Sequence, residues 1–255
     1  EEAEQEYRAA TALNPERWSA HSYLAAFLFR QGRLAEAETA WRQALTLAPE
    51  NARLWSNLGA ALYRQDRYAE ADEAWRKSVA FHPTSAALAN MATRRFFEGK
   101  FDEAVPLYER AANLAPRDYR VWRNYAAVLY WAPGGRARAA DVYRTALDLA
   151  EQNRTLDPAN AVILVELADC LAHTGAGDRA RTTLAEALRL SPRDAYVTSN
   201  AAGVFEHLGD RDLALRWLAV ALEEGYSRTE VEHDPNFTKL RADPRWAALG
   251  SDGAR

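Results

Sequence analysis

Hydrophobic positions between Ala52 and Pro83 form two stripes with the 3.6-residue period of α-helices, separated by a short polar stretch. The first stripe, spaced i, i+3, i+4 and i+7, consists of Trp55, Leu58, Gly59 and Leu62. After the polar Gln65-Asp66-Arg67, the second stripe consists of Tyr68, Ala71, Ala74, Trp75 and Val79. Pro83 ends it, because proline cannot continue a helix. The pattern predicts a helix–turn–helix hairpin whose small residues, Gly59 and Ala71, let the two helices approach closely.

The same hairpin recurs along the chain. The prolines that end the second stripes are separated by 34, 34, 33, 42 and 34 residues, and they are Pro15, Pro49, Pro83, Pro116, Pro158 and Pro192. A hairpin of about 34 residues cannot bury its own apolar faces, so copies must stack against one another. The additional residues of the fourth copy predict a longer second helix that reaches Leu156.

The recurring pattern Trp-x-x-Leu-Gly-x-x-(Tyr/Leu)…Ala-x-x-x-Trp…Pro resembles the tetratricopeptide (TPR) repeat over roughly residues 3–226. The resemblance implies an all-α superhelical solenoid of antiparallel helix pairs. We expect six repeats within residues 15–226, at about 16–49, 50–83, 84–116, 117–158, 159–192 and 193–226.

The two ends depart from the repeat. Residues 1–14 match only a second helix, which indicates either a truncated repeat from a longer protein or a natural N-terminal cap. Residues 227–255 are expected to form capping helices and a tail, with Asp234-Pro235 and Asp243-Pro244 as helix starts. Phe237, Leu240, Trp246 and Leu249 would pack on the last repeat. This tail is similar to those that close bacterial TPR arrays fused to serine/threonine kinase or signalling domains.

Charge and composition exclude several partners. Charged residues make up 27% of the chain but nearly cancel, leaving a net charge of −4, which favours neither nucleic acid nor anionic membranes. No apolar run approaches the roughly 20 residues of a membrane span. The single cysteine, Cys170, rules out an intramolecular disulfide and predicts a buried thiol in a cytoplasmic protein.

Catalytic motifs are absent from the sequence, which contains no phosphate-binding glycine loop, no His-Glu-x-x-His and no Cys-x-x-Cys. We therefore predict no enzymatic activity, no cofactor and no metal. One cluster could contradict the metal prediction, because stacked repeats would bring together Asp169, His173, Glu206 and His207. The simpler interpretation is two histidines at exposed helix ends beside ordinary surface carboxylates.

The resemblance to TPR proteins implies a concave groove lined by the first helices. The residue before the Leu-Gly position, which would face this groove, is Tyr23, Asn57, Asn90, Asn124, Glu166 and Asn200 in successive repeats. Asparagine amides can donate to and accept from a peptide backbone irrespective of its sequence. They can equally bond within the scaffold, and both interpretations stay open.

Aromatic and basic residues follow on the same helices. The expected groove also contains Phe29, Tyr63, Phe96 and Tyr130, then Arg30, Arg64, Phe97 and Trp131, with Arg53, Arg120 and Arg123 nearer the helix starts. Aromatic residues and arginine dominate interface hot spots. We therefore predict that the N-terminal half of the groove binds an extended, partly acidic segment; the alternative is that the aromatics pack between repeats and the arginines are solvated.

These observations predict a non-catalytic scaffold for protein–protein interaction that binds a peptide or protein segment in its groove. Two other functions remain. The chain could regulate a bacterial serine/threonine kinase or cyclase domain that this sequence does not contain, or it could self-assemble into a homo-oligomer through its terminal repeats.

Overall fold

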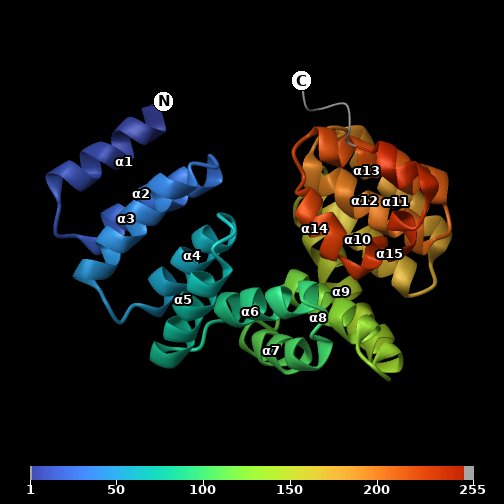
Figure 1. Ribbon diagram of the computed structural model, residues 1–255, viewed down its shortest axis with the longest axis horizontal. Helices are drawn as coiled ribbons and strands as arrows, with labels where there is room; N and C mark the ends of the chain where they lie inside the picture. The colour runs from blue at the N-terminus through green and yellow to red at the C-terminus, as the bar shows by residue number, and fades with distance from the viewer. Residues whose placement is uncertain (1, 250–255) are drawn as a thin grey trace. The chain divides into compact units, whose positions relative to one another are not determined.

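The computed structural model describes residues 2–249, and every regular element in that range is a helix (Figure 1). The first helices of the hairpins are α2 (Trp18–Arg30), α4 (Ala52–Tyr63), α6 (Ser85–Phe97), α8 (Tyr119–Trp131), α10 (Ala161–His173) and α12 (Ala195–His207). The second helices are α3 (Leu34–Leu47), α5 (Tyr68–Phe81), α7 (Phe101–Leu114), α9 (Arg136–Leu156), α11 (Gly177–Leu190) and α13 (Arg211–Glu223). Before them lies α1 (Glu2–Leu13), and after them come α14 (Arg228–His233), η1 (Pro235–Phe237), α15 (Thr238–Arg241) and η2 (Pro244–Ala248). The predicted all-α array of paired helices is confirmed.

Local sequence signals start and stop the helices. Five first helices begin at a side-chain cap that accepts backbone N–H groups of the first turn, namely Asn51, Thr84, Asp118, Asn160 and Asp194. Gly32 follows α2 with φ +75°, as the sequence predicts, and Asp66 has φ +59° after α4. The Tyr68 hydroxyl donates to the Asp66 carboxylate at 2.6 Å, which helps to hold this non-glycine residue in the left-handed region.

The start of α7 differs from what its sequence favours. Asp102 is the residue type that caps helices, and a cap there would keep Pro106 within the first four positions. Instead α7 begins at Phe101, Lys100 precedes it without a side-chain cap, and Pro106 is the sixth helical residue. Asp102 therefore contributes its negative charge to the first turn, where it complements the helix dipole.

A large side chain from each second helix fills the space between helices. At this position the exposed fraction is at most 2%, and the residues are Trp41, Trp75, Tyr108, Tyr143, Leu184 and Leu218. Alanines four residues before them, such as Ala37 and Ala71, are fully buried and leave room for the first helix.

Trp41 and Trp75 occupy equivalent positions of two repeats but differ in the hydrogen bonding of their indole nitrogens. The difference arises because the first helix has alanine in one repeat and glycine in the other. Trp75 lies against Gly59, where an added Cβ would overlap the indole ring, and its Nε1 donates to the Ser56 carbonyl at 3.1 Å. One repeat earlier, alanine (Ala25) stands at the position of Gly59, and the buried Nε1 of Trp41 has no hydrogen-bond partner in the described part of the chain. Glycine at this position thus lets the indole reach a backbone acceptor.

Contacts divide the chain into two compact units, and the boundary lies inside α6. Unit 1 is Glu1–Ala92 and unit 2 is Thr93–Arg255. In unit 1, Arg33 bridges Glu4 of α1 and Glu36 of α3 at 2.7 and 2.6 Å. Arg67 makes the same bridge one repeat later, between Glu38 and Glu70. Helix α1 therefore packs on the first full hairpin as the second helix of a repeat does.

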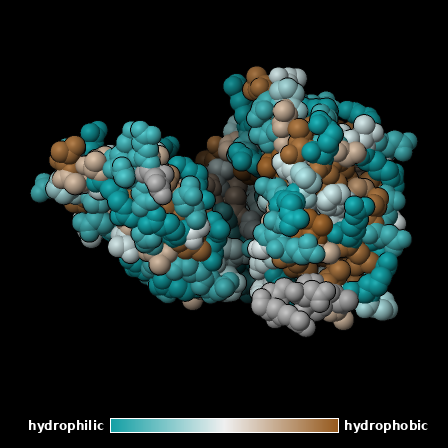
Figure 2. Space-filling model, turned by 90° about the horizontal axis from the view of Figure 1, so that it is seen from above, coloured by the Kyte–Doolittle hydropathy of each residue, from teal (hydrophilic) through white to brown (hydrophobic). Residues whose placement is uncertain are grey.

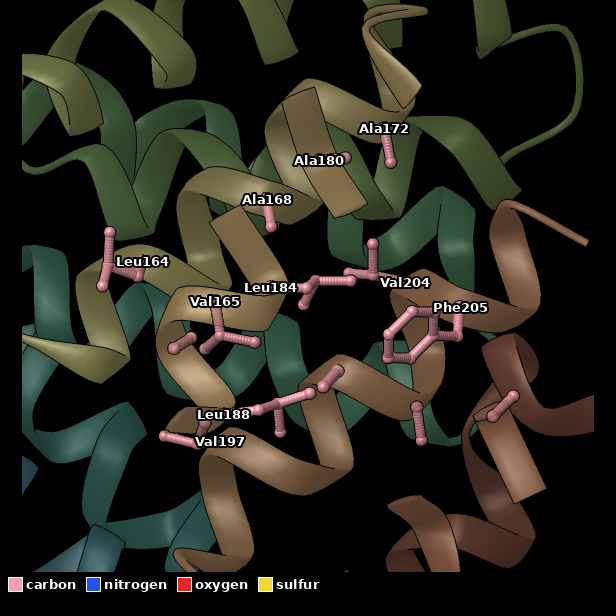
Figure 3. Close-up of a cluster of buried hydrophobic side chains, with 14 of the residues drawn as sticks. Leu164, Val165, Ala168, Ala172, Ala180, Leu184, Leu188, Val197, Val204 and Phe205 are labelled. Atoms are coloured by element: carbon pink, nitrogen blue, oxygen red, sulfur yellow. The ribbon is translucent and has the colours of Figure 1, made fainter. Parts of the chain in front are cut away.

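Unit 2 has a continuous apolar core. Figure 3 shows Leu184 of α11 between side chains of α10 and α12, among them Val165 and Val204. The C-terminal segment joins this core, because Phe237 and Leu240 are buried in it and Trp246 and Leu249 pack against its edge. Asp234 and Asp243 cap η1 and η2 with proline in the first turn, as expected.

Hydrophilic residues predominate on the face seen in Figure 2, and hydrophobic residues show between them. None of the described helices is long and apolar enough to cross a membrane. Cys170 is fully buried, as predicted.

The contact between Gly59 and Trp75 predicts opposite outcomes for the same substitution at two helical glycines. Gly59→Ala should destabilise the protein, since about 1–3 kcal/mol of overpacking exceeds the roughly 1 kcal/mol gained in helix propensity. Gly203→Ala should be neutral or stabilising, because its Cβ would meet only the Phe237 ring, at 3.9 Å. Urea denaturation of both variants measures the difference, and equal stabilities would contradict the close-packing explanation.

Candidate functional site

One face of each first helix carries residues spaced i, i+4, i+7 and i+11, which return to the same side of an α-helix. On α2 these residues are Ser19, Tyr23, Ala26 and Arg30, and on α4 they are Arg53, Asn57, Ala60 and Arg64. Tyr23 and the three arginines are exposed, and the remaining four are half-buried. We call these eight residues of unit 1, together with Phe29 and Asn90, the unit-1 face.

Most polar groups of the unit-1 face have no partner within the described chain. This holds for the guanidinium groups of Arg30 and Arg53 and for the amides of Asn57 and Asn90. Arg64 lies over the Phe29 ring, with its guanidinium carbon 5.0 Å from the ring centre, and donates to the Phe29 carbonyl at 3.5 Å. These groups remain available to bind another molecule.

The aromatic residues of unit 1 are used in two ways. Phe29 packs on Trp41 with ring centres 5.5 Å apart, and Tyr63 packs on Tyr68 and Trp75 at 5.3 and 5.9 Å. Both are half-buried, so part of each ring stays accessible. Tyr23 has no such support and exposes 64% of its surface.

In unit 2 the equivalent asparagines bond within the scaffold. The amide of Asn124 hydrogen-bonds the Tyr108 hydroxyl. Asn200 donates to the Tyr196 carbonyl at 2.8 Å and accepts from Arg123 at 2.6 Å. Of the four predicted asparagines, Asn57 and Asn90 are therefore free of intrachain hydrogen bonds, whereas Asn124 and Asn200 are not.

Arg123 connects three consecutive first helices of unit 2. From α8, its Nε donates to the Asp169 carboxylate at 2.6 Å, and its two terminal nitrogens donate to Glu166 at 3.3 Å and Asn200 at 2.6 Å. Only 14% of the arginine side chain is exposed. This arginine is a structural ion, not the free groove cation that the sequence predicts. Arg120, one turn earlier, is exposed and contacts Asp118 and the Tyr119 ring.

The Asp169 carboxylate of this network is held in its charged form. Burial disfavours the charge on Asp169, but Arg123 and His173 outweigh it and hold the pKa of that carboxyl well below its usual range. Glu166 accepts from the hydroxyls of Tyr119 and Tyr196, both at 2.6 Å. The network thus joins α8, α10 and α12 through bonds that are mostly buried.

Above the network lies a cavity of about 340 Å³ that α8, α10 and α12 line together with the C-terminal segment. The Trp131 indole donates to Asn236 at 3.0 Å, and Phe237 packs near Gly203. Residues 234–239 therefore cover part of the first-helix face in unit 2. The resemblance to TPR proteins implies a groove lined by the first helices, and in unit 2 the C-terminal segment occupies part of that lining. Tyr130 and Trp131 line the cavity.

Three of the four residues in the possible metal cluster do meet. The His173 ring is stacked between Tyr143 and His207, with ring centres 4.3 and 3.9 Å away, and its Nδ1 lies 3.1 Å from Asp169. Glu206 pairs instead with Arg211 at 2.6 Å. Among the described residues no group of three such side chains has the arrangement of a metal site. The histidines are brought together as stacked rings.

Several cavity residues were not predicted from the sequence. They are Tyr143 from a second helix, Tyr226, and Asp234, Asn236 and Lys239 from the C-terminal segment. One signal for the network was visible: the position of Arg123 is occupied by small or apolar residues in the other first helices, namely Ser22, Ser56, Ala89, Val165 and Ser199. A charged residue at an otherwise small, inward position indicates a buried partner.

Replacing Arg123 should strongly destabilise unit 2. Arg123→Ala leaves Asp169 and Glu166 buried without a counter-charge, which typically costs about 3–5 kcal/mol. Arg120→Ala, which removes an exposed arginine from the same helix, should change stability by less than about 0.5 kcal/mol. Thermal unfolding followed by circular dichroism compares the two, and similar midpoints would refute the structural role of Arg123.

The position of Asp234 predicts an unusual pH dependence of the stability of the folded protein. Burial raises the pKa of Asp234 from 3.8 to about 6, so the folded protein retains a proton that the unfolded chain releases. Its stabilising effect is complete below pH about 4 and is lost as pH rises through about 6. Asp234→Asn keeps the cap and should stabilise the protein above pH 6, by up to about 3 kcal/mol, but not below pH 4.

The second Asp-Pro pair is the matched control. Hydrogen bonds from Arg245 lower the pKa of Asp243 to about 2, so its charge is favoured in the folded state. Asp243→Asn should therefore lower the unfolding midpoint above pH 4. Thermal unfolding midpoints of both variants, measured from pH 3.5 to 8, test whether the first substitution raises stability and the second lowers it.

Comparison with known proteins agrees with this architecture. A family model described as tetratricopeptide repeat matches residues 1–42, 90–153 and 174–227, and related TPR models match residues 27–66, 52–85 and 136–199. No curated protein sequence matches the chain.

Solved structures show the same fold at low sequence identity. Cut9 in the APC/C hetero-tetramer Cut9–Hcn1 aligns with a TM-score of 0.64 and 17% identity, over 89% of this chain and 44% of Cut9. PilF of Pseudomonas aeruginosa gives 0.56 and 21%, over 86% and 96% of the two chains. Human IFIT1, solved as a dimer with m7Gppp-AAAA, gives 0.63 and 15%, over 96% and 60%. This chain thus spans less than two thirds of Cut9 and of IFIT1.

TPR arrays generally serve as protein-interaction scaffolds. One TPR model alone covers more than half of the chain, and the paired helices have the corresponding fold. The protein belongs to the tetratricopeptide repeat family.

Proposed function

We propose that the protein is a non-catalytic interaction scaffold whose unit-1 face binds an extended acidic segment of a partner protein. The observation that carries this proposal is the set of exposed arginines and unbonded asparagine amides on the first helices α2, α4 and α6. Arg30 and Arg53 have no counter-charge in the described chain, and Asn57 and Asn90 have unused donors and acceptors.

The geometry of α4 suits an extended chain. Arg53 and Arg64 lie three turns apart on one side of the helix, about 16 Å along its axis, and Asn57 lies between them. An extended peptide covers that distance in about five residues. Its backbone would bond the amide, and its carboxylates would pair with the arginines as charge-assisted hydrogen bonds.

Exposed aromatic surface adds apolar contact to this charge. Tyr23 on α2 and the accessible part of Phe29 lie on the same helix as Arg30. Tyrosine and arginine are enriched among the residues that dominate binding energy at protein interfaces. The unit-1 face therefore combines the two residue types that anchor a partner segment.

Binding of an acidic peptide tests the proposal. A fluorescein-labelled octapeptide of alternating glutamate and alanine, titrated with the full chain in about 50 mM salt, should bind at least about tenfold more tightly than its lysine counterpart. Arg53→Glu and Arg64→Glu should each weaken binding at least about fivefold, and Asn57→Ala with Asn90→Ala should weaken it further.

The control is Arg76→Glu, which makes the same charge change on the exposed surface of the second helix α5. It should alter affinity less than about twofold. An equal loss in the control, or no discrimination between the glutamate and lysine peptides, would contradict a specific unit-1 face.

A further inference from the structure

The cavity of unit 2 contains polar groups that the scaffold does not use. Tyr143 exposes only 2% of its surface, yet its hydroxyl makes no hydrogen bond within the described chain. The His173 side chain is 8% exposed, and its Nε2 has no partner there either. Neither atom is fully enclosed, and both residues line the cavity, so each keeps accessible surface toward it. Buried polar groups without partners are costly, which indicates that a bound molecule completes them.

The two histidines present acceptors to the cavity. His173 Nδ1 lies between the Asp169 carbonyl, at 3.0 Å, and the Asp169 carboxylate, at 3.1 Å, so Nδ1 carries the hydrogen. In the neutral ring Nε2 is then an acceptor. Burial, together with the neighbouring His173, lowers the pKa of His207 and so favours its neutral ring, in which one nitrogen is an acceptor.

Asp234 is the carboxylate of the cavity wall that lacks an ion pair. Of the other acidic residues around the cavity, Asp169 and Glu166 pair with Arg123, and Glu206 pairs with Arg211. The Asp234 carboxylate makes no ion pair with a described residue, although Lys239 also lines the cavity and Arg241 donates to the Asp234 backbone carbonyl at 2.7 Å.

Asp234 itself is poorly satisfied. Its carboxylate accepts from the backbone N–H of Asn236 at 2.8 Å, and burial disfavours its charge. A cation bound beside it would stabilise the charged form. The surrounding rings of Tyr130, Trp131 and Tyr143 offer π-faces and edges of the kind that surround organic cations in proteins.

We propose that this cavity binds a guanidinium group, carried either by an arginine side chain of a partner segment or by a free guanidino compound. The acceptors lie on different walls, at His173, Asp234 and the Tyr143 hydroxyl, which matches the several N–H donors around a planar ion. Guanidinium also stacks on aromatic rings and is less strongly hydrated than ammonium, so it is the better occupant of a narrow aromatic site. A volume of about 340 Å³ accommodates a single side chain.

This site is independent of the proposed function. It lies entirely in unit 2, it recognises the opposite charge, and its variants do not touch the unit-1 face. Failure of one proposal leaves the other unaffected.

Calorimetric titration of the full chain at pH 7.5 tests the site. Acetyl-arginine amide should bind at least about tenfold more tightly than acetyl-citrulline amide, its neutral analogue, and more tightly than acetyl-lysine amide. A hexapeptide with one central arginine separates the two sources: tighter binding than acetyl-arginine amide points to a partner segment, and equal binding points to a free compound. Either result supports the guanidinium site.

Two variants place the binding in the cavity. Asp234→Asn should weaken acetyl-arginine amide at least about tenfold, and because this variant is expected to be more stable at this pH, the loss would not reflect unfolding. Tyr143→Phe should weaken it about threefold or more. The controls are Asp243→Asn, from the second Asp-Pro pair, and Tyr23→Phe on α2; both should bind as the unmodified protein does.

Four results would overturn the proposal. They are the absence of binding heat with acetyl-arginine amide, equal affinity for the citrulline analogue, tighter binding of acetyl-glutamate amide, and unchanged affinity in both cavity variants.

Discussion

The arrangement of unit 2 depends on the need to compensate one buried positive charge. Arg123 cannot lose its proton, so its guanidinium must find acceptors inside the protein. It obtains carboxylates from the next first helix, at Asp169 and Glu166, and an amide from the helix after that, at Asn200. Stacked repeats normally contact only their neighbours. Here a single side chain spans two repeats, and the face of α8, α10 and α12 becomes the wall of a cavity.

The equivalent face has a different chemistry in the two units because this central ion is present in only one of them. In unit 1 the positions that correspond to Arg123 are Ser22, Ser56 and Ala89, which cannot connect one first helix to the next. The asparagines there make no scaffold hydrogen bonds, and the arginines stay exposed. In unit 2 the arginine and Asn200 satisfy each other, and residues 234–239 cover part of the surface. One repeat pattern therefore supports an open polar surface in one unit and an enclosed site in the other.

Unit 2 also contains groups that reduce its own stability. Asp234 is placed where its charge is disfavoured, and the polar atoms of Tyr143 and His173 lack partners. A scaffold selected for stability alone would favour asparagine in place of Asp234 and phenylalanine in place of Tyr143. Such unfavourable groups are tolerated in proteins mainly where a ligand stabilises them. Their concentration around one cavity distinguishes it from the ordinary gaps between helices.

By itself, the amino-acid sequence determined the helix hairpins, their turns, the buried aromatic and alanine positions and the Asp-Pro helix starts, because each depends on local spacing and backbone preference. It also identified the first-helix face on which every candidate residue lies. Tertiary structure decided which of those residues are free. Arg123 and Asn200 meet although they are 77 positions apart. Asn236 reaches Trp131 across 105 positions. Contacts of this kind depend on how far successive hairpins rotate relative to one another and on where the C-terminal segment folds back. The repeat period determines neither of these.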